Sequence, residues 1–353
     1  MTIWSNTSEL EDALRDAGLG EWAPRLVQLA RHCIVLVPGP LADGAKAPLG
    51  ACRLGGEPDM PPDVDWPVRP PVLEKTASIL AGAMPGHVLL GPRHWLHRLL
   101  RTQRWRQATQ EWERSRQAER EIRSRAWPLS FVAQIDFAEL HAVHTLDGFP
   151  ATGRLLLFCD PLDWPWGEPE DQARVGALFT QLPAKRLQRR PSPPEFDTPE
   201  ARRMMPRGYV CKPRTLRPTA WLLPPPQGSR ELLRLQAEAP AAWAYQADAF
   251  SAYGRFWSDV YARHPETFSP RGDMIHQVGG TAFSIQEPVE QACAKFAGDA
   301  AEGADNWQLV LQIDSDIEVG MEWGDVGRLY LCARRVDLAA LQFDRCWMVM
   351  QCY

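Results

Sequence analysis

The sequence predicts an α+β fold whose β-rich core is built twice. One strand-loop-strand pattern recurs: LSFVAQIDFAEL (129–140) then GRLLLFCD (153–160), and QLVLQIDSDIEV (308–319) then GRLYLCAR (327–334). A Gly-Gly pair precedes each copy, at 55–56 and 279–280. The alternation within each copy places a Val-Gln-Asp face opposite an apolar face, with Phe131 and Ala133 on the same apolar side. We therefore expect internally duplicated units with mixed or antiparallel sheets.

Helices are expected to flank the duplicated core at its N-terminal side. Ser8 and Glu11 have the spacing of a capping box, and Gly18 supplies a stop for this first helix. A second helix is expected near Trp22, with Pro24 in its first turn, running toward His32. CIVLVPGP then predicts a short buried strand that closes at a proline.

The chain divides into an N-terminal part and one large domain. The predicted boundaries are 1–37 for the N-terminal helices with the first strand, and 38–353 for the domain. Within the domain we expect pseudo-repeats at about 50–163 and 271–340, a long Arg/Trp-rich helical insertion at 88–126, a Pro/Arg-rich, loop-rich connection at 183–228, and an amphipathic helical stretch at 230–264.

The connection between the two strands of the second copy is rich in acids. It diverges from its counterpart in the first copy, and loops on a repeated scaffold are where function concentrates. The candidate residues for contact with a partner or ligand here are Asp314, Asp316, Glu318, Glu322, Trp323 and Asp325. A solvated acidic turn is the plain alternative. An EF-hand is disfavoured because Val319 occupies the place of its sharp-turn glycine.

Charge and composition set the broad class of the protein. The 353 residues carry a net charge of −5, yet 88–126 has ten Arg against four Glu, and 183–217 has ten Lys or Arg against three acids. The rest of the body is therefore acidic and suits basic partners. No apolar run reaches the length of a membrane span, the acidic N-terminal stretch lacks the apolar region typical of a secretory signal, and eight scattered cysteines fit a reduced state. We expect a cytoplasmic protein with no membrane partner.

The basic stretch 88–126 raises the question of nucleic acid, because arginine contacts phosphate and indole stacks on bases. Its tryptophans recur at helical spacing and fall on the apolar seam, opposite most arginines. This arrangement favours a core or a protein interface over nucleic acid. Arg104, Trp105 and Trp112 are the candidate contact residues here.

The motifs of common enzyme classes are missing from the sequence. There is no nucleophile elbow, phosphate-binding loop, dinucleotide fingerprint or zinc-protease motif. The pairs His94/His97 and His141/His144 lack a supporting ligand, so we expect no metal and no cofactor. His276 and Gln277 precede the second Gly-Gly pair, and His276 could join the acids in general acid/base chemistry or simply hold backbone geometry.

Several stretches resemble the YwqG-like family, a bacterial group of unknown function. They are RLGGEPDMPPDVDWP (53–67), PLSFVAQIDFAEL (128–140), GRLLLFCDP (153–161), HQVGG (276–280) and the closing block 307–353. The resemblance implies an α+β, internally repeated, cytoplasmic protein, and it supplies no catalytic residues. After HQVGG the chain departs from the family's usual Tyr-Pro turn with Thr281, Ala282 and Phe283.

Two functions are compatible with these patterns. The first is a non-catalytic protein-binding role, as an immunity or antitoxin-like protein that captures a basic toxin through its acidic, aromatic loop. It follows from charge complementarity and from the settings that the resemblance implies. The alternative is an enzyme or a small-ligand binder with its site between the repeats near His276, Asp314 and Asp325.

Overall fold

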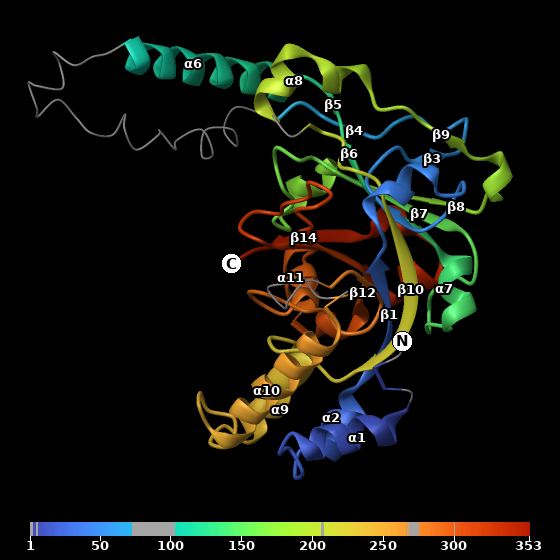
Figure 1. Ribbon diagram of the computed structural model, residues 1–353, viewed down its shortest axis with the longest axis vertical. Coiled ribbons are helices and arrows are strands. Elements are labelled where there is room, and N and C mark those ends of the chain that lie inside the picture. The colour runs from blue at the N-terminus through green and yellow to red at the C-terminus, as the bar shows by residue number, and fades with distance from the viewer. Residues whose placement is uncertain are drawn as a thin grey trace, which may run out of the picture.

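Figure 1 shows the computed structural model of the chain, whose elements keep the labels of that figure. The structure describes residues 3–4, 6–72, 103–205, 208–265, 267, 275–299 and 301–353. Within these ranges, no helix is both long and apolar enough to span a bilayer.

A ten-stranded sheet organises the described part of the chain, and each of its pairings is antiparallel. The strand order is β14-β13-β12-β11-β1-β10-β2-β6-β7-β8. The bounds are β1 Arg31–Pro38, β2 Arg53–Leu54, β6 Ser130–Asp136, β7 Arg154–Cys159, β8 Val175–Thr180, β10 Arg214–Leu223, β11 Gln277–Val278, β12 Trp307–Asp314, β13 Arg328–Arg334 and β14 Trp347–Gln351. Two small sheets pair β3 (Asp59–Met60) with β9 (Gln188–Arg189), and β4 (Val68–Arg69) with β5 (Trp127–Pro128).

The large sheet is duplicated about its central pair, β1 and β10. Four strands continue on each side in the same order, β2-β6-β7-β8 on one and β11-β12-β13-β14 on the other. Asp136 lies opposite Arg154 in the β6/β7 pair, and Asp314 lies opposite Arg328 in the β12/β13 pair. The repeated sequences therefore occupy equivalent places, and the predicted α+β, internally duplicated fold is confirmed.

Both halves contain a β-bulge at the same point of the repeated strand. The register shifts between Phe131 and Ala133 in β6, and between Leu309 and Leu311 in β12. Since a bulge inserts one residue, it reverses the alternation of faces. Phe131 consequently packs beside Phe158, while Ala133 joins the main core. The expectation of one common face for Phe131 and Ala133 is wrong for this reason.

The described ranges contain nine α-helices in addition to the sheets. They are α1 Thr7–Asp16, α2 Ala23–Leu29, α6 Gln103–Arg123, α7 Phe137–Val143, α8 Pro199–Met204, α9 Arg230–Glu238, α10 Asp248–Arg263, α11 Val289–Phe296 and α12 Arg335–Ala339. Short 3-10 turns are η1 Leu41–Lys46, η2 Pro169–Arg174, η3 Ala184–Arg186, η4 Pro194–Asp197, η5 Ala301–Asn306 and η6 Phe343–Arg345. In Figure 1, α6 projects from the body beside α8, and α1 and α2 lie at the opposite end.

The helix predictions are right in kind and differ in detail. The first helix is capped by Asn6, whose side chain accepts a hydrogen bond from the Glu9 N–H at 3.0 Å, so the predicted capping box at Ser8 is wrong. Pro24 does lie in the first turn of α2, which ends at Leu29. The predicted stretch 230–264 divides into α9 and α10, with Pro240 in the break between them.

The connection 183–228, predicted to be loop-rich, contains the central strand β10. Its residues 216–223 pair with the whole of β1, its first two residues pair with β2, and Pro218 lies opposite Leu36. The many Pro and Arg residues and the weak periodicity of 183–228 predict loops, and proline also lacks the N–H that a strand pairing requires. Long-range pairing with the apolar β1 outweighs this local disadvantage.

The sheet curls until its two edges approach each other. Phe179 of β8 stacks on Phe343 of η6 with ring centroids 4.6 Å apart. The Gln172 side chain also bridges to the edge strand β14, accepting from the Met348 N–H at 3.0 Å and donating to its carbonyl oxygen at 3.2 Å. One core, with residues from both halves such as Ile135 and Ile313, fills the inner face. The helices α1, α2, α9 and α10 cover a second core on the other face.

Candidate functional site

The acidic connection predicted to contact a partner is partly buried inside the protein. Asp314, at the end of β12, is 3% exposed and forms an ion pair with Arg328 at 2.8 Å. It also accepts hydrogen bonds from the Ile275 N–H at 2.8 Å and from the Gln312 amide at 2.9 Å. Burial raises the pKa of Asp314, against the opposing effects of Arg328 and His276. This carboxylate therefore stabilises the interior of the protein and is not part of a contact surface.

His276 belongs to the same buried group. Its Nδ1 accepts a hydrogen bond from the Asp314 backbone N–H at 3.1 Å, so the ring proton of the neutral tautomer is on Nε2. That nitrogen faces Asp316 Oδ2 at 4.0 Å, and Asp316 also pairs with Arg214 at 2.9 Å. Burial raises the pKa of Asp316, but His276 and Arg214 outweigh it and keep that pKa below its usual value. His276 lines none of the cavities described below.

The duplicated motif residues hold the two Gly-Gly loops in place. Gln134 and Gln312 each accept a hydrogen bond at 3.0 Å, from the N–H of Asp59 and of Phe283 respectively. Each amide also donates at 3.0 Å to a backbone carbonyl before its loop, that of Ala51 or Ile275. Gln277 is fully buried and donates to the Thr281 carbonyl at 2.9 Å. Because Gln134 and Gln312 make equivalent hydrogen bonds in the two halves, we assign the repeated motif a structural role.

The remaining acids of the connection 315–327 lie at its surface. The Glu318 side chain is 66% exposed, although its carboxylate reaches Arg214 at 2.8 Å. Glu322 and Asp325 are exposed as well, and Ile317 between the acids is 64% exposed. Trp323 is 5% exposed and packs inward. The connection thus has a buried acidic base and an exposed acidic rim.

The candidates on the arginine-rich helix are described in part. Arg104 and Trp105 belong to α6, but the structure does not describe their side chains. His94 and His97 lie outside the described residues altogether. Trp112 is half-buried, with the Arg116 guanidinium over its ring at 5.3 Å.

A cavity of about 390 Å³ lies where the two halves meet, between the start of β6 and the acidic connection. The wall is mainly apolar and aromatic, as in most sites for small molecules. Its residues are Ser130, Phe131, Val132, Cys159, Pro161, Trp164, Met205, Gly208, Tyr209, Cys211, Gly320, Met321, Glu322, Trp323 and Gly324. The structure therefore places two predicted candidates, Glu322 and Trp323, in this wall, and leaves Asp314 and His276 outside it.

Three polar side chains of this wall have no hydrogen-bond partner among the described residues. They are the Ser130 hydroxyl, the Tyr209 hydroxyl and the Trp323 indole N–H. Their residues are 5%, 2% and 5% exposed. An unpaired buried donor costs on the order of 1–3 kcal/mol, so its presence calls for an explanation. A ligand with acceptor atoms would satisfy such donors after a small adjustment of the side chains.

The thiols and the phenol of the wall are held in their neutral forms. Burial raises the pKa of Cys159 well above its ordinary value, and Asp160 adds to this effect. Burial likewise raises the pKa of Cys211 to about 12. The pKa of Tyr209 is raised by burial and by the charge of Asp160. Since the thiolate is the nucleophilic form, the two cysteines are suited to packing and not to covalent catalysis.

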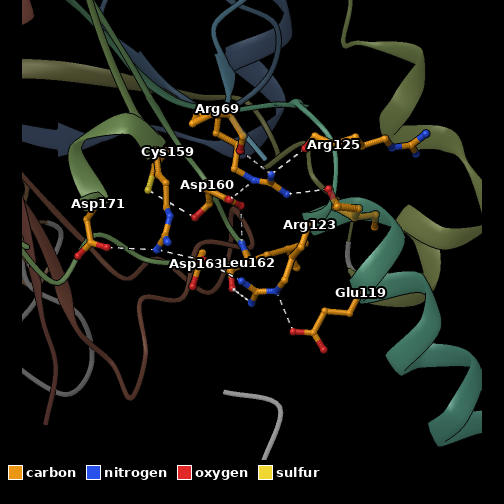
Figure 2. A network of polar contacts seen from close by, with 12 residues as sticks. Arg69, Glu119, Arg123, Arg125, Cys159, Asp160, Leu162, Asp163 and Asp171 are labelled. Carbon is orange, nitrogen blue, oxygen red and sulfur yellow. Dashed lines mark hydrogen bonds and ion pairs between the residues drawn. The ribbon is translucent and has the colours of Figure 1, made fainter. Parts of the chain in front are cut away.

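A buried network of arginines and aspartates (Figure 2) adjoins the wall at Cys159. Arg69 pairs with Asp160 at 2.6 Å, next to Cys159 of the cavity. Arg123, near the end of α6, pairs with Asp163 at 2.7 Å and with Glu119 at 2.9 Å, and Arg69 also bonds backbone carbonyls of that region. Arg174 completes the network through Asp163 at 3.0 Å and Asp171 at 3.1 Å. The network fixes both α6 and the segment 160–164 that contributes to the wall.

Sequence reasoning missed most of this wall. Met205, Tyr209 and Cys211 belong to the segment predicted to be a loop-rich connection, where no periodicity marks them. Ser130 and Cys159 lie in the predicted strands and would be expected in a core. Among the described residues, no cluster of three or more His, Cys, Asp or Glu could hold a metal ion.

Comparison with known proteins identifies the chain at the level of a family. A search of the curated proteins finds no match. The model of the family described as a domain of unknown function, DUF1963, matches residues 52–352, which include both halves of the sheet and every residue of the cavity wall. The chain therefore belongs to the DUF1963 family.

Proposed function

We propose that the protein binds a small molecule in the cavity between the two halves of its sheet. The observation that carries this proposal is the set of three unpaired donors, on Ser130, Tyr209 and Trp323, in an otherwise apolar wall. The volume of about 390 Å³ falls in the range of small-molecule sites. The neutral thiols favour binding over catalysis.

The wall also indicates the chemical class of the ligand. Among the described residues, the lining contains one carboxyl side chain, that of Glu322, and no lysine, arginine or histidine, so an anionic ligand is disfavoured. The three donors require acceptor atoms, and the rings of Phe131, Trp164 and Trp323 suit a flat apolar body. We infer an uncharged aromatic or polycyclic molecule that carries carbonyl or ether oxygens.

A fluorescence titration with prodan tests this proposal. Prodan is a neutral naphthalene with a ketone oxygen, and its emission shifts to the blue in an apolar site. The wild type is expected to bind it, and Tyr209→Phe, which removes one donor, is expected to weaken binding by about threefold to tenfold.

A second variant separates the cavity from unspecific binding. Met205→Trp introduces a larger side chain at a half-buried position of the wall and should abolish the shift. Leu233→Trp adds the same side chain at an exposed position on α9 and should bind like the wild type. If Met205→Trp, folded as shown by circular dichroism, binds prodan as the wild type does, the cavity is not the site.

The protein-binding role, as an immunity or antitoxin-like protein, is the second candidate. It is supported by the exposed rim of the acidic connection, where Ile317 and Glu318 are 64% and 66% exposed. Tyr353, also 66% exposed, donates its backbone N–H to the Asp325 carbonyl and so lies against the same rim. An acidic rim with apolar side chains suits a basic polypeptide such as a toxin domain.

The test of this second role is retention of a polypeptide from the source cells. Glu318→Lys with Asp325→Lys should lose a partner that the wild type retains, and raised salt should weaken the complex. Glu21→Lys, an exposed position near α2, is the control for a charge change elsewhere. An unchanged set of retained polypeptides in the double variant would contradict the role of the rim.

Within the DUF1963 family, we place the chain in the YwqG-like group and in the cytoplasm. The motifs at 53–67 and 276–280 support the first placement. The eight cysteines are all free thiols, which supports a reducing compartment.

A further inference from the structure

A second cavity, of about 440 Å³, lies against the Gly-Gly loop of the second half. It is polar, and its wall has no residue in common with the apolar cavity. The first turns of α9 and α11 contribute Arg230, Glu231 and Glu290, and the start of α12 contributes Arg335. The loop 279–281 forms another side of the cavity.

The corresponding loop of the first half is covered by the chain itself. The Gly56 N–H donates to the Cys211 carbonyl at 2.8 Å, and a Cβ on Gly56 would meet the Pro213 side chain at 2.8 Å. In the second half, a Cβ on the equivalent Gly280 would meet the Cys33 side chain at 2.6 Å, while the nearest atoms to a Cβ on Gly279 belong to Leu146 and Phe149, which themselves line the polar cavity. The first loop is therefore covered by the segment 211–213, whereas the second loop borders a cavity on its Gly279 side.

The charges in this wall are incompletely matched. Arg230 pairs with Asp305 at 2.9 Å and with Glu231 at 3.4 Å. Glu290 is 7% exposed and has no ion-pair partner among the described residues. Arg31 donates to the carbonyls of residues 28 and 30, and Arg335 donates to Gln308 and to the Asp305 carbonyl, so neither has a carboxylate partner in the described part.

Among the described residues, the cavity thus presents one buried carboxyl that forms no ion pair and two guanidinium groups that have no carboxylate partner. Arg230, whose side chain is more than nine-tenths buried, also has an Nε that lacks a hydrogen-bond partner. We propose that this cavity binds a zwitterionic small molecule of the amino-acid or short-peptide class, with its ammonium group at Glu290 and its carboxylate at Arg335 and Arg31. The site is independent of the function proposed for the apolar cavity.

The protonation of Glu290 gives the proposal a specific signature. Burial, aided by the charge of Glu231, raises the pKa of Glu290 to about 7, while Arg230 and Arg335 oppose this effect. The other ionisable groups of the wall are Arg31, His32, His144 and Asp147, and His32 stacks on His144 with centroids 4.3 Å apart. An ammonium group beside Glu290 would favour its charged form, so binding below pH 7 should release a proton.

Isothermal titration calorimetry of the full chain with trialanine tests the site. At about pH 6, the heat in buffers of different ionisation enthalpy should report release of about one proton per peptide bound. N-acetyl-trialanine and trialanine amide each lack one charge and should bind at least about tenfold more weakly. The twenty free amino acids extend the panel to smaller ligands.

Two glutamine variants show whether trialanine binding depends on the Glu290 carboxyl group itself. Glu290→Gln should weaken trialanine by about tenfold or more and remove the proton release. Glu287→Gln, nearby but 47% exposed and outside the wall, should behave like the wild type. Failure of every zwitterion in the panel to bind at up to about 10 mM would overturn the proposal. Proton release that persists in Glu290→Gln would come from another group and overturn the role of Glu290.

Discussion

Asp314 shows at the scale of one residue how a candidate contact residue can be part of the interior. Its carboxylate meets Arg328, the Ile275 N–H and the Gln312 amide within 2.9 Å. From the sequence, an acid in a divergent connection is equally compatible with a surface or a core. The distinction depends on Arg328 and Ile275, which the chain brings there from 14 and 39 positions away.

Replacement of Asp314 by asparagine tests this assignment. Asp314→Asn removes the carboxylate that pairs with the buried Arg328, and breaking such a buried pair costs about 3–5 kcal/mol in free energy of unfolding. Glu318→Gln, on the same connection but 66% exposed, should cost less than about 1 kcal/mol. Urea unfolding of both variants provides the measurement. Equal small losses would show that Asp314 has no structural role.

At the scale of elements, α6 depends on a few ion pairs near its C-terminal end. Its predicted helical character follows from the spacing of its apolar residues, and Ala118 and Ile122 are indeed buried. Its attachment to the body could not be predicted, because Arg123 finds Asp163 only after the segment that follows β7 is in place. The sequence shows many arginines, and the structure distinguishes the one that anchors the helix.

Arg123→Ala should therefore loosen α6. The change leaves Glu119 and Asp163 without this guanidinium, although Arg174 still reaches Asp163 at 3.0 Å. We expect a loss of about 3 kcal/mol in stability and faster amide hydrogen exchange in 103–123. Arg114→Ala removes an arginine that is 63% exposed and should change both quantities little. Unchanged exchange in Arg123→Ala would mean that other contacts hold the helix.

At the scale of the whole molecule, the sequence predicts the duplication and misses the centre of the sheet. The repeats are visible because strand alternation and the Gly-Arg-Leu motif are local patterns. The strand β10 is invisible to this reasoning, because Pro218 disfavours a strand locally and its partner β1 lies about 180 residues earlier. The cavity between the halves cannot be predicted for the same reason, since Met205, Tyr209 and Cys211 reach its wall through long-range contacts.

The dependence of stability on pH also belongs to the whole molecule, and Glu290 should dominate part of it. The pKa of its buried carboxyl is about 7 in the folded state and that of an ordinary Glu is about 4.5, so folding favours the protonated form. The contribution of the protonated Glu290 to the free energy of unfolding is fully present below about pH 4.5 and is lost as the pH rises through 7.

Glu290→Gln keeps the shape of the side chain and removes its charge. The difference in free energy of unfolding between the variant and the wild type should therefore rise in favour of the variant by about 2–3 kcal/mol as the pH goes from about 5 to about 8. Urea unfolding at both pH values measures this gain, and Glu287→Gln, 47% exposed, should show none. A gain of the same size at both pH values would point to better packing of the amide. No gain at either would mean that Glu290 is compensated within the fold, and the cavity would then lack the unmatched carboxyl on which its ligand depends.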